Sequence, residues 1–167
     1  MNKKQKGFSL IELLIVVAII LIIAAIAIPN LLRARMAANE SSAVGSLRTI
    51  NTANGNFLTQ YNHSFAPSLV TLGGATIAAP VCTQSNLIDP TLGGSDPSTK
   101  SGYKFTYTPG AVDPGDKVCA SVLGYSVSAV PASYANSGVR SFFTDQTGVI
   151  RGADHGGAAG SVADPPL

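Results

Sequence analysis

The stretch KGFSLIELLIVVAIILIIAAIAIP, residues 6–29, decides the fold, because it has the length of a membrane span and a single acidic side chain. Its 21 residues Phe8–Ile28 would form about 32 Å of helix, and the hydrocarbon core of a bilayer is about 30 Å thick. Lys3, Lys4 and Lys6 precede this stretch, and no comparable cluster of positive charge follows it. We therefore expect a single transmembrane helix with a cytoplasmic N-terminus.

The acidic side chain is that of Glu12. A carboxylate at the centre of a membrane helix costs about 2.5–3.5 kcal/mol, and less near the end, so such a group usually faces a partner. Cleavage just before Phe8 would supply one, because the new α-amino group would lie about 6 Å of helix rise from Glu12. An α-amino group has an unperturbed pKa of about 7.7–8.0 and is largely protonated near neutral pH. Ammonium and carboxylate could then neutralise each other within one chain. Between staggered chains the same pair would also set the register of neighbouring helices.

Two other interpretations fit the apolar segment. A cleaved secretory signal would explain the basic start, and Ala25-Ile26-Ala27 resembles a small-residue cleavage site. However, the uninterrupted apolar stretch of 16 residues, Leu13–Ile28, exceeds the usual core of about 7–15 residues in a signal, and a signal gains nothing from Glu12. An ordinary membrane anchor also leaves Glu12 unexplained.

The segment resembles the prepilin N-terminal signature of type IV pilins and the related pseudopilins. That signature has a short basic leader, a Gly, a Phe, a Glu four residues later and a long apolar helix. The resemblance implies cleavage by a prepilin peptidase between Gly7 and Phe8, and N-methylation of Phe8 by the same enzyme. It also implies that Glu12 pairs with the N-terminal amine of a neighbouring subunit, and that Pro29 is the helix-kinking proline of the family. Many members carry Gly where this chain has Leu21, and Leu favours helix by nearly 1 kcal/mol over Gly, which argues against local melting.

The helical pattern continues beyond Pro29. Apolar or small residues recur three or four positions apart, a spacing typical of one buried helix face: Leu32, Met36, Ala43, Leu47, Ile50, Phe57 and Tyr61. We expect one helix from Phe8 to about Tyr61, bent at Pro29, because proline lacks the N–H for one backbone bond. Residues 29–61 would form the amphipathic half and pack against a sheet.

The domain order follows from this helix. Residues 1–7 form the cytoplasmic leader that is removed, and residues 8–28 form the half that spans the membrane or fills a filament core. Residues 62–101 are rich in Gly, Pro, Ser and Thr and predict a loop-rich connector with one short strand or turn of helix. Residues 102–151 carry strand patterns, and residues 152–167 predict a surface tail. The expected fold class is α+β and pilin-like, with a three- or four-stranded antiparallel sheet on the outer half of the helix.

Three segments predict the strands. YKFTYT, residues 103–108, alternates aromatic and polar side chains, as a half-buried strand does. KVCASVLGYSVSAVP predicts one bent strand or two short ones, with Gly124 at a bulge. GVRSFFTDQTGVIRG predicts a hairpin with strands Val139–Thr144 and Val149–Arg151 and a turn through Asp145 and Gly148.

The two cysteines, Cys82 and Cys119, have neither CxxC spacing nor a neighbouring His, so zinc and thioredoxin-type sites are disfavoured. Outside the cytoplasm a disulfide between them is expected, and two buried thiols are the alternative. Closing a loop of about 38 residues would stabilise the fold by roughly 3–4 kcal/mol on the chain-entropy model.

The charge and residue content exclude several function classes. The formal charge is +2 from 11 basic and 9 acidic residues; without the three leader lysines it is 8 against 9, or −1. No basic stripe remains for nucleic acid. The histidines predict a helix cap at His63 and a solvated loop at His155, and no GxSxG elbow or phosphate-binding loop is present in the sequence. Calcium at Asp145 and Asp154 is the lesser alternative to turns. We expect no enzyme activity, no cofactor and no metal site.

The function that the resemblance implies is that of a structural subunit. The chain would polymerise through its apolar helix into a type IV pilus, with further copies of itself, prepilin peptidase and inner-membrane assembly machinery as partners. The precursor would be a single-pass inner-membrane protein, and the product an extracellular filament. The alternatives are a pseudopilin of a type II secretion or competence system, which forms a periplasmic pseudopilus, and a membrane-tethered binding module that never polymerises. The resemblance favours a pilin over a pseudopilin for two reasons. Major pseudopilins usually carry a tryptophan-containing motif before their sheet and this chain has no Trp, and the long connector suits a pilin.

Overall fold

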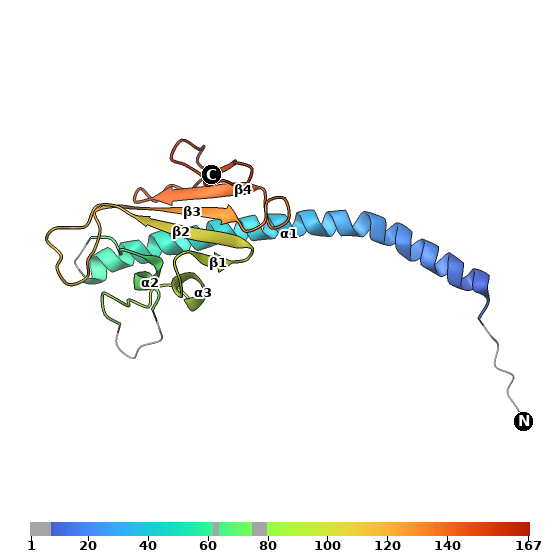
Figure 1. Ribbon diagram of the computed structural model, residues 1–167, viewed down its shortest axis with the longest axis horizontal. Coiled ribbons are helices and arrows are strands. Elements are labelled where there is room, and N and C mark those ends of the chain that lie inside the picture. Colours follow the sequence, from blue (N-terminus) through green and yellow to red (C-terminus); the bar gives the residue numbers. More distant parts are fainter. Residues whose placement is uncertain (1–7, 62–63, 75–79) are drawn as a thin grey trace, which may run out of the picture. The chain divides into compact units, whose positions relative to one another are not determined.

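The computed structural model describes residues 8–61, 64–74 and 80–167 (Figure 1). The predictions for the leader, including Gly7, and for His63 therefore lie outside the described residues. The chain divides into two compact units, Met1–Arg35 and Met36–Leu167. The helix α1, Leu10–Tyr61, contributes residues to both units.

The first unit contains the N-terminal half of α1. The helix begins at Leu10, two residues later than expected, because Ser9 occupies the position that caps it. Pro29 lies inside α1, and the residues on both sides of it are helical. The bend expected at Pro29 stays a prediction.

The second unit is built on the outer half of α1, which lies alongside the sheet in Figure 1. One face of this half is buried, and its residues recur at the predicted helical spacing: Ala43, Ser46, Leu47, Ile50, Ala53, Asn54 and Phe57. Leu47, Ile50 and Phe57 are fully buried. These side chains and the inward residues of the sheet form one hydrophobic core.

The sheet is antiparallel and has five strands in sequence order. They are β1 (Ser98–Lys100), β2 (Tyr103–Pro109), β3 (Tyr125–Pro131), β4 (Arg140–Asp145) and β5 (Arg151–Asp154). Alternate residues face the core, because successive side chains of a strand point to opposite faces. The inward set contains Tyr103, Phe105, Tyr107, Tyr125, Val127, Ala129 and Phe142. The α+β class and the packing of helix on sheet are thus confirmed.

β1 lies in the connector, where one short strand or turn of helix was expected without being placed on particular residues, and it is the fifth strand of a sheet expected to have three or four. Ser101 and Gly102 have φ of 49° and 73°, both in the left-handed region. Two such residues make the tight turn of a two-residue hairpin, and Lys100 pairs with Tyr103 across it. The Ser101-Gly102 pair is the sequence feature that could have predicted this hairpin, but the surrounding residues, rich in Pro and Gly, favoured a loop.

The rest of the connector holds two short helices, α2 (Leu69–Leu72) and α3 (Pro90–Gly93). They meet where Gly73 faces Gly93, and a Cβ on Gly73 would lie 2.5 Å from the Cα of Gly93. Glycine at both positions is therefore required by the close approach of two backbones.

Three boundaries differ from the expectation. In the segment KVCASVLGYSVSAVP the strand begins only at Tyr125, and Cys119 lies in a loop. The second strand of the predicted hairpin is shifted to Arg151–Asp154. The C-terminal tail folds back on β5, where the Gly152 N–H donates to Pro165 O at 3.1 Å and the Leu167 N–H donates to Ile150 O at 3.0 Å.

Candidate functional site

The start of α1 places Glu12 next to a backbone donor of its own chain. The Ser9 N–H donates to Glu12 Oε2 at 2.9 Å, and the Leu13 N–H donates to Ser9 O at 3.2 Å. Ser9 and Glu12 have the S-x-x-E spacing of a capping box, in which the acidic side chain satisfies a backbone donor at the helix end. A charged partner was expected for Glu12, and this backbone donor was not. The spacing was visible in the sequence.

The surface around Glu12 is apolar on all sides of the helix. Large apolar side chains from Leu10 to Ile28 are exposed, from 45% for Val17 to 75% for Leu10. Among the described residues, α1 is the helix long and apolar enough to cross a membrane, with a mean hydropathy of 3.3 in its most apolar window. A secretory signal meets the same criterion. An apolar surface of this extent marks contact with lipid or with other chains.

The second unit attaches its sheet to α1 through Glu40. This carboxylate accepts from the Val139 N–H at 3.0 Å, from the Arg140 N–H at 3.2 Å and from Arg140 Nε at 3.0 Å. The side chain of Glu40 is 13% exposed. Burial raises the pKa of Glu40, but the hydrogen bonds from Val139 and Arg140 and the charge of Arg140 together lower it below the ordinary value.

A buried polar cluster also joins helix and sheet. Tyr107 Oη donates to Ala66 O at 2.6 Å, and the Ala66 N–H donates to Asn54 Oδ1 at 3.2 Å. Nearby, Tyr125 Oη donates to Asn51 Oδ1 at 3.0 Å. Burial raises the pKa of Tyr125 to about 12, and the charge of Asp145 adds to the shift. These groups remain neutral at physiological pH and fix the helix on the sheet.

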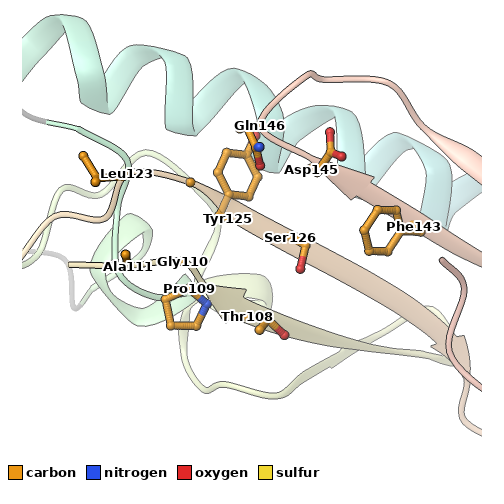
Figure 2. Close-up of a pocket in the computed structure, with 11 residues that line it drawn as sticks. Thr108, Pro109, Gly110, Ala111, Leu123, Tyr125, Ser126, Phe143, Asp145 and Gln146 are labelled. Carbon is orange, nitrogen blue, oxygen red and sulfur yellow. The ribbon is translucent and has the colours of Figure 1, made fainter. Parts of the chain in front are cut away.

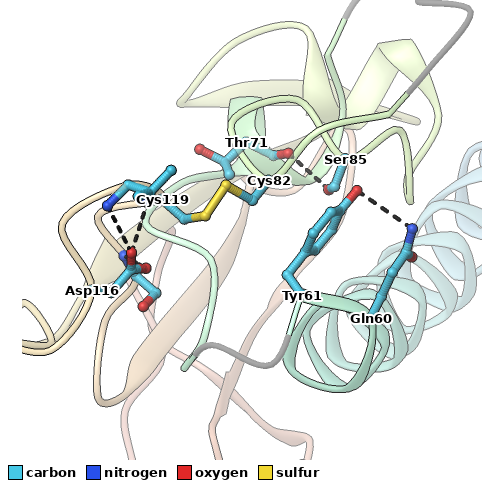
Figure 3. Close-up of a disulfide and its surroundings, with 9 residues drawn as sticks. Gln60, Tyr61, Thr71, Cys82, Ser85, Asp116 and Cys119 are labelled. Carbon is cyan, nitrogen blue, oxygen red and sulfur yellow. Dashed lines mark hydrogen bonds between the residues drawn. A yellow bond between two sulfur atoms is a disulfide. The ribbon is translucent and has the colours of Figure 1, made fainter.

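Figure 3 shows the disulfide of this unit and its surroundings. Cys82 and Cys119 are bonded as predicted, with their Cα atoms 5.5 Å apart and a sequence separation of 37. Asp116 holds the loop beside Cys119: it accepts from the N–H groups of Val118 at 3.0 Å, Cys119 at 2.8 Å and Ser121 at 3.0 Å. Hydrogen bonds from Ser121, Cys119 and Val118 lower the pKa of Asp116 far below its ordinary value. The carboxylate therefore organises the loop as an anion.

The expected metal ligands are kept apart. Asp145 ends β4, and Asp154 pairs with Arg140 at the start of that strand, which separates the two acids by about 17 Å at 3.3–3.4 Å per residue. The described residues contain no group of three or more His, Cys, Asp or Glu side chains that could hold a metal ion. Asp145 and Asp154 therefore lie too far apart to share one ion.

His155 lies in a more ordered setting than the solvated loop expected for it. Its Nε2 is 2.8 Å from Oδ2 of Asp164, which is 7% exposed and also accepts from the Ser161 N–H. Hydrogen bonds from Ser161 and His155 lower the pKa of Asp164, although burial opposes them. This cluster fastens the tail, and the Ser161 hydroxyl also donates to Asp164 Oδ1 at 3.2 Å.

Comparison with known proteins supports the resemblance to type IV pilins that the N-terminal segment indicated. Residues 2–28 match the family model described as the prokaryotic N-terminal methylation motif. The chain is 46% identical over 59 residues to the type IV major pilin protein PilA of Myxococcus xanthus. It is 64% identical over 39 residues to the type IV wide pilus major component PilA4 of Thermus thermophilus. The chain thus carries the prokaryotic N-terminal methylation motif and is similar over part of its length to type IV pilins.

The two alignments with pilins cover 35% and 23% of this chain. They span only 27% and 30% of these relatives, so the pilin likeness rests on a part of each protein. Residues 116–165 match a second model, described as a protein of unknown function (DUF2950). No solved structure matches the chain. The two family models thus match separate parts of the chain, residues 2–28 and residues 116–165.

Proposed function

We propose that this protein is a pilin, a structural subunit that polymerises through its N-terminal helix into a type IV pilus. The observation that carries the proposal is the pilin segment itself, whose apolar residues are exposed on every side of α1. Such a surface needs partners all round it, as a helix in a lipid bilayer or in the centre of a filament has.

Maturation comes first in this function. A prepilin peptidase cleaves between Gly7 and Phe8 and methylates the new amine of Phe8. Glu12 then has two possible donors, the Ser9 N–H of its own chain and the ammonium of a neighbouring subunit. The first satisfies the carboxylate in an isolated subunit, where Ser9 N lies 2.9 Å away. The second is charged, and a charge-assisted hydrogen bond is roughly twice as strong as a neutral one.

Cohesion of the filament comes from the apolar residues of the same segment. Burying one Leu, Ile or Val side chain away from water contributes about 1.5–3 kcal/mol. Exposing the apolar side chains from Leu10 to Ile28 outside lipid would thus cost on the order of 20 kcal/mol per subunit. Inside the bilayer this driving force is absent, because lipid tails are as apolar as these side chains. Subunits that leave the membrane must therefore bury their helices against one another.

The remaining partners and locations follow from this sequence of events. The precursor is a single-pass protein of the inner membrane with its N-terminus in the cytoplasm, and inner-membrane assembly machinery draws it into the filament. No catalytic role is assigned. Pro29 is assigned the bend between the apolar and the amphipathic halves of the helix. The pseudopilin alternative is less favoured, because both curated relatives are named as components of type IV pili.

Imaging and mass spectrometry of sheared cells test the proposal. We expect long fibres that contain this protein, and a mature N-terminus at methylated Phe8. A matched Gly7→Val variant should block cleavage, retain Met1 and give no fibres. Recovery of the mature protein with an intact leader would contradict the polymerisation mechanism. A processed protein without fibres at native expression would instead support a pseudopilin.

A further inference from the structure

A row of polar side chains crosses the outer face of the sheet, on the side away from α1. Thr108 of β2 pairs with Ser126 of β3, and Ser126 pairs with Asp145 of β4. Neighbouring strands lie about 4.8 Å apart, so the three side chains form one line on the same face. Gln146 follows Asp145 and brings an amide to the end of this line (Figure 2).

These polar groups are available for a ligand. The hydroxyls of Thr108 and Ser126 and the amide of Gln146 make no hydrogen bond within the part of the chain that the structure describes. Asp145 uses one carboxylate oxygen, Oδ1, which accepts from the Thr147 N–H at 2.9 Å. Together they offer two hydroxyls, an amide and a carboxylate oxygen, which can donate as well as accept.

A hollow of about 440 Å³ lies over this row. Its apolar wall comes from Pro109, from the half-buried ring of Phe143 in the adjacent row, and from Leu123, which is 57% exposed. Gly124 belongs to its lining, and a Cβ there would lie 3.4 Å from Gln146 Oε1. A larger side chain at this position would therefore occupy the space next to the amide.

We propose that this hollow binds a neutral pyranose sugar. A pyranose offers hydroxyls that donate and accept, together with an apolar C–H face that packs on an aromatic or aliphatic wall. The volume lies within the range of about 300–1,000 Å³ that is usual for small-molecule sites. Asp145 disfavours an anionic sugar, and no basic side chain lines the hollow to offset it.

Saturation-transfer NMR on the full-length protein tests this site. The protein is kept in lauryldimethylamine oxide, because detergents with sugar headgroups would compete. The probes are methyl β-D-galactopyranoside, methyl α-D-mannopyranoside, methyl N-acetyl-β-D-glucosaminide and, as the anionic comparison, N-acetylneuraminic acid. We expect transfer to the ring protons of at least one neutral sugar and none to N-acetylneuraminic acid.

Variants locate the binding. Gln146→Ala and Ser126→Ala should each weaken the affinity by about 3- to 10-fold, as the loss of one hydrogen bond does. Gly124→Val should abolish binding by occupying the space next to the Gln146 amide. Ser128→Ala is the matched control, since it lies on the same strand and face outside the lining, and it should leave binding unchanged. Absence of transfer to all three neutral sugars, preference for the anionic sugar, or undiminished binding in Gln146→Ala and Gly124→Val with an unchanged melting temperature would each overturn the proposal.

Discussion

The two halves of α1 differ in what they require from their surroundings. Of the residues between Leu10 and Arg35, only Ala24 is other than exposed. Between Met36 and Tyr61, seven residues are buried on one face, and the opposite face carries polar and small side chains. A helix that is apolar all round needs partners on every side, whereas an amphipathic one needs a single packed surface.

The chain thus supplies the amphipathic half of α1 with a packing partner, the sheet, and supplies none to the apolar half among the described residues. The sheet satisfies the outer half within one molecule, so the second unit has the core of an independent domain. The apolar half, from Leu10 to Arg35, leaves its apolar side chains exposed in the single chain and needs lipid or other protein chains around it. A subunit that moves from a membrane into a polymer needs this division, because its folded domain must survive the exchange of surroundings.

The largest expected effect is the loss of filament assembly when the apolar half of α1 is changed at Glu12, with the amphipathic half left intact. Glu12→Ala removes both the capping of Ser9 and the charge, so we expect normal processing but no filaments. Glu12→Gln is the sharper variant, because Gln can still accept the Ser9 N–H in a capping box but carries no charge. Filament yield by shearing and electron microscopy measures both. Normal assembly of Glu12→Gln would show that the cap, and not the ion pair, is the required interaction.

The next effect concerns the folded core. Phe57 is fully buried, and Phe→Ala in such a position costs about 3–5 kcal/mol of unfolding free energy. Leu21→Ala, in the apolar half, is the matched control: Leu21 is 63% exposed, and its loss should leave the thermal unfolding of the second unit unchanged. Calorimetry of both proteins in the same detergent distinguishes them. Equal destabilisation would contradict the separation of the two halves.

The disulfide comes third. Replacing Cys82 and Cys119 by Ser removes the crosslink between two positions that are 37 residues apart in the sequence. The unfolding free energy should fall by roughly 3–4 kcal/mol on the chain-entropy model. Thermal unfolding with and without reductant measures the loss. Reductant should have no effect on the double variant, and an unchanged melting temperature in the variant would mean that Asp116 alone holds the loop.

The features predicted from sequence are those encoded by local pattern. The spacing of Leu47, Ile50 and Phe57 predicted the buried face of α1, and the alternation of aromatic and polar side chains predicted β2. The two cysteines gave the disulfide, since no other pair exists. Hydrophobic period and residue count are properties of a short window, so no tertiary contact is needed to recognise them.

The features that were missed depend on contacts between distant residues or on short turns. The hairpin of β1 depends on the backbone of Ser101, and the attachment of the tail depends on Asp164 and on carbonyls that meet β5. The row of Thr108, Ser126 and Asp145 exists only through the register of three strands. Strand register is a tertiary property, and a shift of one residue would place these side chains on the opposite face.

The smallest expected effect is a dependence on pH that belongs to the outer half alone. The pKa of Glu40 is lowered from its ordinary value of 4.5 in the folded protein. Its contribution to stability is therefore complete above pH 4.5 and is lost as the pH falls through the lower, folded pKa. Since Arg140 is 48% exposed, solvent screening limits this contribution to about 1 kcal/mol or less.

Glu40→Gln should remove this part of the acid sensitivity, because the neutral amide neither titrates nor attracts Arg140. Melting temperatures between pH 3 and pH 7 should therefore fall less steeply for Glu40→Gln than for the unmodified protein. Glu12→Gln removes a carboxylate from the apolar half and is the control, since the described hydrogen bond of Glu12 stays within the first turn of α1. An equal change of slope in both variants would mean that stability responds to net charge and not to the hydrogen bonds that join Glu40 to β4.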